Sequence, residues 1–167
     1  MLIAVLYPTG GGIGLIGIWK AMRELEALGW LKGLPARLIA VQAEGCRPVV
    51  DAWERRADRA EIARDPRTVA SGRRVPLPFA DTLRLRAVRE TDGMVVAVTH
   101  DELLDGMSEL ASTEGVLACP EGAALVPALR RLIETGELER DARVVMLNTG
   151  NGLKYTDLLK TQRKVAS

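Results

Sequence analysis

The sequence predicts an α/β fold: an open, three-layer, mostly parallel sheet with helices on both of its faces. Apolar runs typical of strands alternate along the chain with segments of helical spacing, as in proteins built from βαβ units. The first run, Leu2–Leu6, is apolar at every position, which is typical of a strand buried on both faces of a parallel sheet. The length of 167 residues and the 47% of hydrophobic residues fit a single domain over 1–167.

The first helix is expected directly after a glycine-rich turn. Its apolar positions recur at helical spacing and are Leu15, Ile18, Trp19, Met22 and Leu25. Gly29 stands where a C-terminal cap belongs. A second strand is expected at Arg37–Gln42, and a helix over 47–63 with Pro48 tolerated in its first turn. Residues 65–78 are rich in Arg, Pro, Ser and Gly and predict a loop.

The second half of the chain continues the alternation of helices and strands. Thr99 and Glu102 have the spacing of a capping box and predict the start of a helix. In order, the expected elements are a short helix within 79–93, a strand at Met94–Val98, a helix over 101–115, a strand at Val116–Cys119, a helix over 121–136 and a strand over 143–148 that ends in a final helical turn. Five strands are therefore expected.

Composition excludes several classes of function. A net charge of +1 and an aromatic content of 4% argue against nucleic-acid partners. Glycines and charges interrupt the apolar runs, so we expect no signal peptide and no membrane span. Cys46 and Cys119 form no CxxC pair, which fits a reduced, cytoplasmic setting. No His, Cys or Asp cluster has the spacing of a metal site.

The glycine-rich turn is the most informative stretch. "PTGGGIGLIG" places five glycines within Gly10–Gly17, between the first strand and the first helix. Free N–H groups at a helix start favour a phosphate, and residues without side chains let it approach the backbone. Gly12–Gly17 also matches G-x-G-x-x-G, with Glu44 as a candidate ribose ligand, so a nucleotide- or dinucleotide-binding Rossmann-type domain stays open.

Four blocks carry a family resemblance. These are "YPTGGGIGLIGIWKAMRELEALGW", "TVASGRRVPLPFADTLRLRAVRE", "CPEGAALVPALRRL" and "NTGNGLKY". In this order they resemble the threonine synthase family and, more broadly, the fold type II pyridoxal-phosphate enzymes. The resemblance covers the C-terminal part of that family. It implies pyridoxal 5'-phosphate as cofactor and the conversion of O-phospho-L-homoserine and water into L-threonine and phosphate.

The resemblance also implies which residues hold the cofactor. The positions that fall on the phosphate loop of the family are Gly10, Gly11, Gly12, Ile13 and Gly14. Many relatives carry a hydroxyl or amide side chain at one of the last two positions, and this chain carries neither. Thr149 falls on the residue whose hydroxyl meets the pyridine nitrogen, where a neutral group leaves that nitrogen largely unprotonated. From the residues alone, Thr149 fits a helix N-cap equally well.

The Schiff-base lysine of the family belongs to its N-terminal half, which has no counterpart here. The lysines of this chain are Lys20, Lys32, Lys154, Lys160 and Lys164, and none stands in a matching motif. We therefore assign no catalytic residue and expect each lysine to be a surface charge. A catalytically inactive fragment, or the partner subunit of a split enzyme, remains an alternative function.

Other polar residues receive structural interpretations. His100 is expected to be exposed, and Cys119 to be a buried thiol without a catalytic partner. Glu121 either approaches the cofactor ring or serves a helix start, and Arg73 and Arg74 are expected in a solvated loop.

The last expectation concerns assembly. With nothing before it to cover its edge, the strand Leu2–Leu6 is expected to pair with a second copy of the chain or with an N-terminal partner half.

Overall fold

The computed structural model describes residues 3–63, 66, 68–70, 75 and 80–158. Four strands and six α-helices form the described part of the chain. In order they are β1 (Ile3–Pro8), α1 (Ile13–Ala27), β2 (Ala36–Ala43), α2 (Pro48–Glu54), α3 (Asp81–Glu90), β3 (Met94–Val98), α4 (His100–Thr113), α5 (Pro120–Ala123), α6 (Leu125–Glu134) and β4 (Arg143–Met146), followed by a 3₁₀ helix at Gly152–Tyr155.

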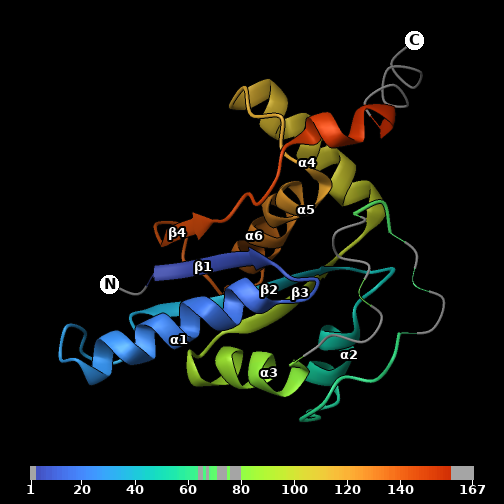
Figure 1. Ribbon diagram of the computed structural model, residues 1–167. Coiled ribbons are helices and arrows are strands. Elements are labelled where there is room, and N and C mark those ends of the chain that lie inside the picture. The colour runs from blue at the N-terminus through green and yellow to red at the C-terminus, as the bar shows by residue number, and fades with distance from the viewer. Residues whose placement is uncertain (1–2, 64–65, 67, 71–74, 76–79, 159–167) are drawn as a thin grey trace.

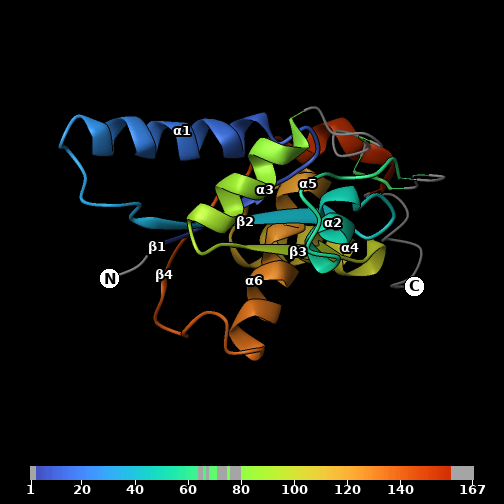
Figure 2. The same cartoon turned by 90° about the horizontal axis from the view of Figure 1, so that it is seen from below.

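The sheet is parallel throughout, in the order β3-β2-β1-β4. The helices α1 and α3 cover one face, while α4, α5 and α6 lie on the other (Figures 1 and 2). The register places Ile3 of β1 beside Ala36 of β2 and beside Arg143 of β4. The three-layer, parallel α/β fold expected from the sequence is thereby confirmed.

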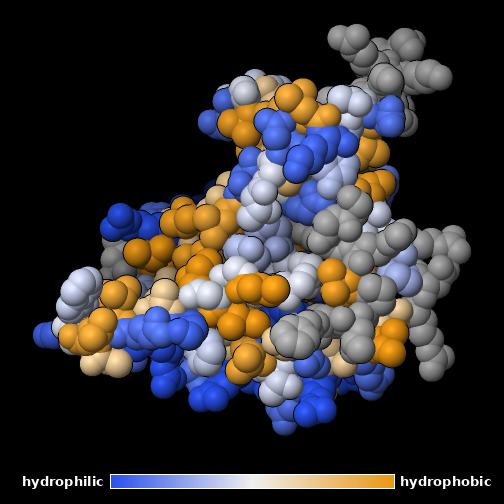
Figure 3. All heavy atoms as spheres, in the orientation of Figure 1, coloured by the Kyte–Doolittle hydropathy of each residue, from blue (hydrophilic) through white to orange (hydrophobic). Residues whose placement is uncertain are grey.

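The strand β1 lies inside the sheet and is not an edge. It pairs with β2 on one side and with β4 on the other, and Val5 is only 9% exposed. The expectation of an uncovered first strand is therefore wrong, because the late strand β4 returns to cover it. The edges of the described sheet are β3 and β4. On β4, Val145 and Met146 are exposed. Figure 3 shows apolar side chains reaching the surface over this part of the sheet.

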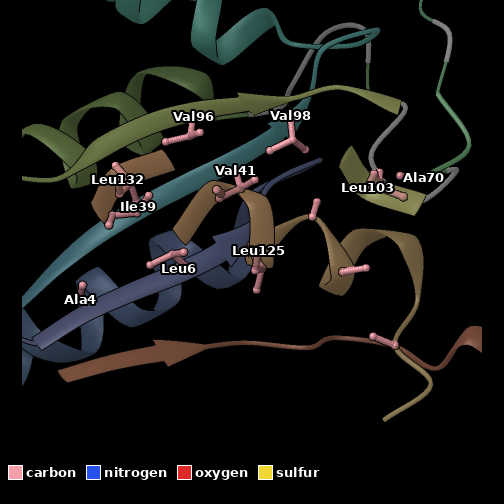
Figure 4. Close-up of a cluster of buried hydrophobic side chains, with 14 of the residues drawn as sticks. Ala4, Leu6, Ile39, Val41, Ala70, Val96, Val98, Leu103, Leu125 and Leu132 are labelled. Carbon is pink, nitrogen blue, oxygen red and sulfur yellow. The ribbon is translucent and has the colours of Figure 1, made fainter. Parts of the chain in front are cut away.

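The larger core lies between the sheet and α4–α6. Leu6, Ile39 and Val96 of three neighbouring strands face Leu125 and Leu132 of α6 (Figure 4). These side chains are between 0% and 8% exposed. Burial of a large aliphatic side chain contributes about 1.5–3 kcal/mol each. The core therefore holds the carboxyl ends of the strands in a fixed arrangement.

The opposite face of the sheet packs against α1 and α3. Leu15 and Met22 of α1 are buried there, and Val88 of α3 lies in the same cluster. On the surface, Trp19 of α1 donates a hydrogen bond of 3.0 Å to Glu90 of α3. Arg23 donates to the same carboxylate at 2.7 Å. The two helices are thereby joined at their outer side.

Several helices begin and end as expected. The side chain of Thr99 accepts from the N–H of Glu102, while the Glu102 carboxylate accepts from the N–H of Thr99, so the capping box is confirmed. The strand β3 spans the expected Met94–Val98. Gly29 follows α1 in the left-handed region, with φ +75°.

Two helices are shorter than expected. The helix over 47–63 stops at Glu54, because Arg56 takes φ +55° and the N–H of Ala60 donates to the Asp81 carboxylate at 2.6 Å. The segment 121–136 divides into α5 and α6. Pro127 has no N–H and its ring crowds the carbonyl four residues earlier, so an unbroken helix through Ala123 is disfavoured.

The strand expected at Val116–Cys119 does not join the sheet. Ala118 makes an isolated antiparallel bridge with Asn151, and Cys119 is already the N-cap of α5. Ala118 and Cys119 of this run are buried beside the segment after β4, whereas Val116 is exposed. Most of the expected loop over 65–78, which includes Arg73 and Arg74, lies outside the described residues. In the part of the chain that the structure describes, no helix is long and apolar enough to cross a membrane.

Candidate functional site

A cavity opens where β1 and β4 end. Its volume is about 290 Å³. The residues that line it are Tyr7, Pro8, Gly10, Gly11, Gly12, Cys119, Glu121, Thr149, Gly150, Lys154 and Tyr155. Ligands of open α/β sheets bind at the carboxyl ends of strands, and this cavity has that position.

One wall of the cavity is the glycine loop before α1. Gly12 has φ +70°, which is the left-handed region that glycine tolerates best, and it precedes the first helical residue. Among the described residues, no side chain caps the start of α1. The first N–H groups of the helix are therefore not taken up by a capping side chain, which leaves them available to an anion.

Gln42 fixes the position of Thr9, the residue before the glycine loop. This side chain is buried, and its amide N–H donates to the Thr9 carbonyl at 3.2 Å. Its amide oxygen accepts from the N–H groups of Val49 and Val50 at 2.9 and 3.2 Å. The end of β2 thus fixes both the loop that follows β1 and the start of α2.

Two side chains pack closely against the loop, and one of them, Tyr7, also lines the cavity. A Cβ on Gly14 would lie 2.5 Å from Cζ of Tyr7, so the phenol ring occupies the place of a side chain at that position. A Cβ on Gly12 would lie 2.6 Å from Cζ of Arg84. Close packing therefore requires glycine at both positions.

The opposite wall is formed by the segment after β4. The N–H of Cys119 donates to the Gly150 carbonyl at 3.3 Å, and the N–H of Gly152 donates to the Leu117 carbonyl at 2.9 Å. These bonds bring Thr149 to the cavity. The N-cap of the following 3₁₀ helix is Asn151, whose side chain accepts from Leu153 at 2.8 Å. The alternative interpretation of Thr149 as the helix cap is therefore wrong.

Cys119 and Glu121 line the cavity beside this wall. Cys119 is 3% exposed, and its sulfur accepts from the N–H of Gly122 at 3.4 Å. Burial raises the pKa of the Cys119 thiol, and the neighbouring Glu121 raises it further. Tyr155 donates a hydrogen bond of 2.7 Å to the buried Glu121 carboxylate. The thiol is therefore protonated at neutral pH, as expected of a buried cysteine.

The structure brings some of the expected site residues together and separates others. Gly10, Gly11 and Gly12 line the cavity together with Thr149. Ile13 and Gly14 are the first residues of α1 and do not line it, and Ile13 is 71% exposed.

The sequence interpretation missed Tyr7 and Arg84, which pack against Gly14 and Gly12. For Arg84 a signal existed, because it shares a helix face with Ala87, Val88 and Thr91, where an apolar residue is expected.

The remaining candidates lie elsewhere. His100 is exposed at the start of α4, and Glu44 is exposed and does not line the cavity. Among the described lysines, Lys20 and Lys32 are exposed, and Lys154 is exposed but lines the cavity. No group of three metal-ligating side chains occurs within the described residues.

A glycine loop between a parallel strand and a helix, opening on a cavity at the strand ends, defines an α/β protein with a candidate ligand site at that edge of the sheet. The family described as "Pyridoxal-phosphate dependent enzyme" matches residues 2–150. The chain belongs to this family, whose members use pyridoxal phosphate. This membership favours pyridoxal phosphate over the dinucleotides of a Rossmann-type domain.

Curated relatives carry the name threonine synthase. The protein of Methanocaldococcus jannaschii is 33% identical over 153 residues, which are 92% of this chain and 38% of that protein. The protein of Methanosarcina acetivorans is 36% identical over 150 residues, which are 90% of this chain and 37% of that protein. The chain therefore spans less than half the length of these relatives.

Solved structures share the fold. A threonine deaminase from T.th. superposes with a TM-score of 0.65 at 24% identity, covering 89% of this chain and 48% of that one. An L-serine ammonia-lyase from Rhizomucor miehei gives a TM-score of 0.70 at 20% identity, covering 95% of this chain and 49% of that one.

The residues present fit one part of the cofactor. The uncapped helix start and the glycine loop offer N–H donors to a phosphate, and a Cβ on Gly11 would meet nothing within 4 Å, so the loop is open on that side. Thr149 offers a neutral hydroxyl on the facing wall. For the aldehyde end of the cofactor, the described lysine that lines the cavity is Lys154.

Proposed function

We propose that the chain forms the phosphate-binding part of a threonine synthase-like enzyme. Its substrate would be O-phospho-L-homoserine, and its products L-threonine and phosphate. The C–O bond to phosphate at the γ-carbon breaks, and the oxygen of a water molecule is added at the β-carbon. The observation that carries this proposal is the cavity that joins Gly10–Gly12 to Thr149, in a chain 33–36% identical to threonine synthases.

The residues of this chain have distinct parts in the proposed site. The N–H groups of Gly11 and Gly12 and of the first turn of α1 hold the cofactor phosphate. The hydroxyl of Thr149 meets the ring nitrogen and, being neutral, leaves it largely unprotonated. When bound, the cofactor acts as the electron sink for elimination and replacement at the substrate. Glu121, held by Tyr155, faces the same cavity as a carboxylate.

We further propose that the reacting lysine comes from outside these 167 residues. Lys20 and Lys32 do not line the cavity, and no lysine of the chain stands in the family motif. A partner subunit, or another part of a longer protein, would supply it. The exposed edge strand β4, with Val145 and Met146 on its surface, is where we expect such a partner or a second copy to pair.

Thermal unfolding with added ligands tests the cofactor assignment. We expect pyridoxal phosphate to raise the melting temperature and NAD to leave it unchanged, because a ligand stabilises only the fold that binds it. Protection by NAD alone would replace the proposal with the Rossmann-type alternative.

Borohydride treatment followed by mass spectrometry tests the lysine assignment. We expect no stoichiometric pyridoxyl-lysine. A single complete modification at Lys154 would show that this chain carries its own reacting amine. Adding the N-terminal half of a threonine synthase and measuring phosphate released from O-phospho-L-homoserine then tests the reaction, and the chain alone is the control.

A further inference from the structure

Arg84 is a charged side chain in the core of the protein. It lies on α3 and is 0% exposed, on the same helix face as the buried Ala87 and Val88. An arginine is seldom fully buried unless its charge has a partner or a use, because removing it from water is costly. Its position therefore calls for a role beyond packing.

The guanidinium is bound to the back of the glycine loop. Its Nη2 donates a hydrogen bond to the carbonyl oxygen of Gly11. A Cβ on Gly12 would lie 2.8 Å from the same Nη2 and 2.6 Å from Cζ, so the side chain lies against this peptide. Arg84 does not line the cavity, whereas Gly11 and Gly12 do. The loop therefore stands between the cation and the ligand.

This contact orients one peptide group. The peptide between Gly11 and Gly12 is trans, so its C=O and N–H point in opposite directions. Because the carbonyl of Gly11 points to Arg84, the N–H of Gly12 points away from it, on the cavity side of the loop. The left-handed conformation of Gly12, next to the helix start, is the kind of geometry that gathers backbone N–H groups around an anion.

We propose that Arg84 is a positioning residue for phosphate: it turns the Gly11–Gly12 peptide toward the cavity and places a positive charge directly behind it. The site thereby selects ligands with a doubly charged phosphate monoester. This inference rests on the proposed function, since it assumes that the loop holds the cofactor phosphate.

The charge persists under ordinary conditions. Burial lowers the pKa of Arg84 to about 10, and the carboxylate of Asp81 acts in the opposite direction. The guanidinium is thus protonated at neutral pH. Low dielectric surroundings strengthen its attraction for a nearby phosphate relative to the same charge on the surface.

Pyridoxal phosphate and pyridoxal form the test, because they differ only in the phosphate. Dissociation constants for both are measured on the wild-type chain, Arg84→Met, Arg84→Lys and the control Arg86→Met, which removes an exposed arginine from the same helix. We expect Arg84→Met to weaken the binding of pyridoxal phosphate by about tenfold or more, and the binding of pyridoxal by less than about twofold. Arg84→Lys keeps the positive charge but lacks the planar guanidinium donors. For this variant we expect an intermediate loss of affinity for pyridoxal phosphate and none for pyridoxal. Arg86→Met is expected to change neither.

The outcomes separate the inference from the proposed function. If wild-type protein binds pyridoxal phosphate and both Arg84 variants bind it equally well, Arg84 merely fastens α3 to the loop and the inference fails. Equal losses for both ligands would also overturn it, since general damage to the fold would be the cause. If Arg84→Met does not fold, the ligand difference in Arg84→Lys decides. Failure of the wild-type chain to bind either pyridoxal phosphate or inorganic phosphate would overturn both proposals.

Discussion

The two walls of the cavity are built on different principles. The glycine loop presents backbone groups and packs against Tyr7 and Arg84, with Gln42 bonded to the residue before it. The facing wall presents the exposed side chain of Thr149, on a segment joined to Leu117–Cys119 by two backbone hydrogen bonds. The fixed wall of backbone groups suits an invariant group such as phosphate, while the side chains of the facing wall suit a ring or a substrate.

Changing Gly12 to alanine tests the fixed wall and is expected to have the largest effect. The new methyl group would collide with the Arg84 guanidinium, and residue 12 would have to keep a left-handed conformation. We expect the free energy of unfolding to fall by about 2–4 kcal/mol and pyridoxal phosphate binding to fall by about tenfold or more. Denaturant unfolding and ligand titration measure the two effects.

Gly17→Ala is the matched control for this prediction. Gly17 lies inside α1, and a Cβ there would meet nothing within 4 Å. Alanine should stabilise the helix by up to about 1 kcal/mol. Equal effects of the two substitutions would show that the loop is not packed as described.

Changing Thr149 to valine tests the facing wall. The side chain is exposed, so the free energy of unfolding should change by less than about 0.5 kcal/mol. Loss of one hydrogen bond should lower the affinities for pyridoxal phosphate and for pyridoxal alike, by about fivefold each. Thr149→Ser keeps the hydroxyl and should bind like the wild type. A loss confined to pyridoxal phosphate would place Thr149 on the phosphate and contradict its role at the ring.

The hydroxyl of Tyr7 gives a smaller test on the fixed wall. Tyr7 lines the cavity, and its ring takes the place of a side chain at Gly14, so we expect its hydroxyl to donate to the phosphate. Tyr7→Phe should lower the affinity for pyridoxal phosphate by about threefold and leave pyridoxal unchanged. Isothermal titration with both ligands measures this. Unchanged binding of pyridoxal phosphate would limit Tyr7 to packing.

The smallest effect is expected at Glu90, which joins α3 to α1. The hydrogen bond from Arg86 holds the pKa of Glu90 below its ordinary value, with Trp19 and Arg23 acting in the same direction. A lowered pKa in the folded state stabilises the protein above the ordinary value of 4.5 and loses this contribution as the pH falls through the folded value. Glu90→Gln should therefore cost about 0.5 kcal/mol at pH 7 and nothing in strong acid.

Urea unfolding of Glu90→Gln at several pH values checks this dependence. Glu26→Gln, an exposed change on α1, serves as the control. A cost that stays constant down to strong acid would mean that the amide itself, and not the lost charge, is responsible.

Much of the fold follows from local patterns in the sequence. The strand Met94–Val98 and the capping box at Thr99 depend on neighbours in the chain, and both are confirmed. The errors arise where distant contacts decide. The segment after Glu54 contains good helix formers, yet the contact of Ala60 with Asp81 ends the helix early. The run Val116–Cys119 reads as a strand, but Asn151 provides its partner outside the sheet.

The candidate site was predictable to the extent that it is made of backbone. The run of glycines at a strand end predicts the loop, because residues without side chains leave the backbone accessible there. The role of Thr149 needed the family resemblance, since its approach to the cavity depends on hydrogen bonds to Leu117–Cys119. The position of Arg84 on an apolar helix face can be recognised in the sequence. Its contact with Gly11, like that of Tyr7 with Gly14, follows only from the packing of α1 against α3 and β1.

The parallel pairing of β1 with β4 has a consequence for how the protein folds. Ile3 of β1 pairs with Arg143 of β4, roughly 140 residues later, whereas its pairing with β2 needs roughly a quarter of that separation. Closing so long a loop is entropically unfavourable, and a ribosome releases the early strand first. The glycine loop is therefore synthesised long before Thr149 arrives to face it. The protein should therefore gain the ability to bind the cofactor only late in refolding, after β4 has paired with β1.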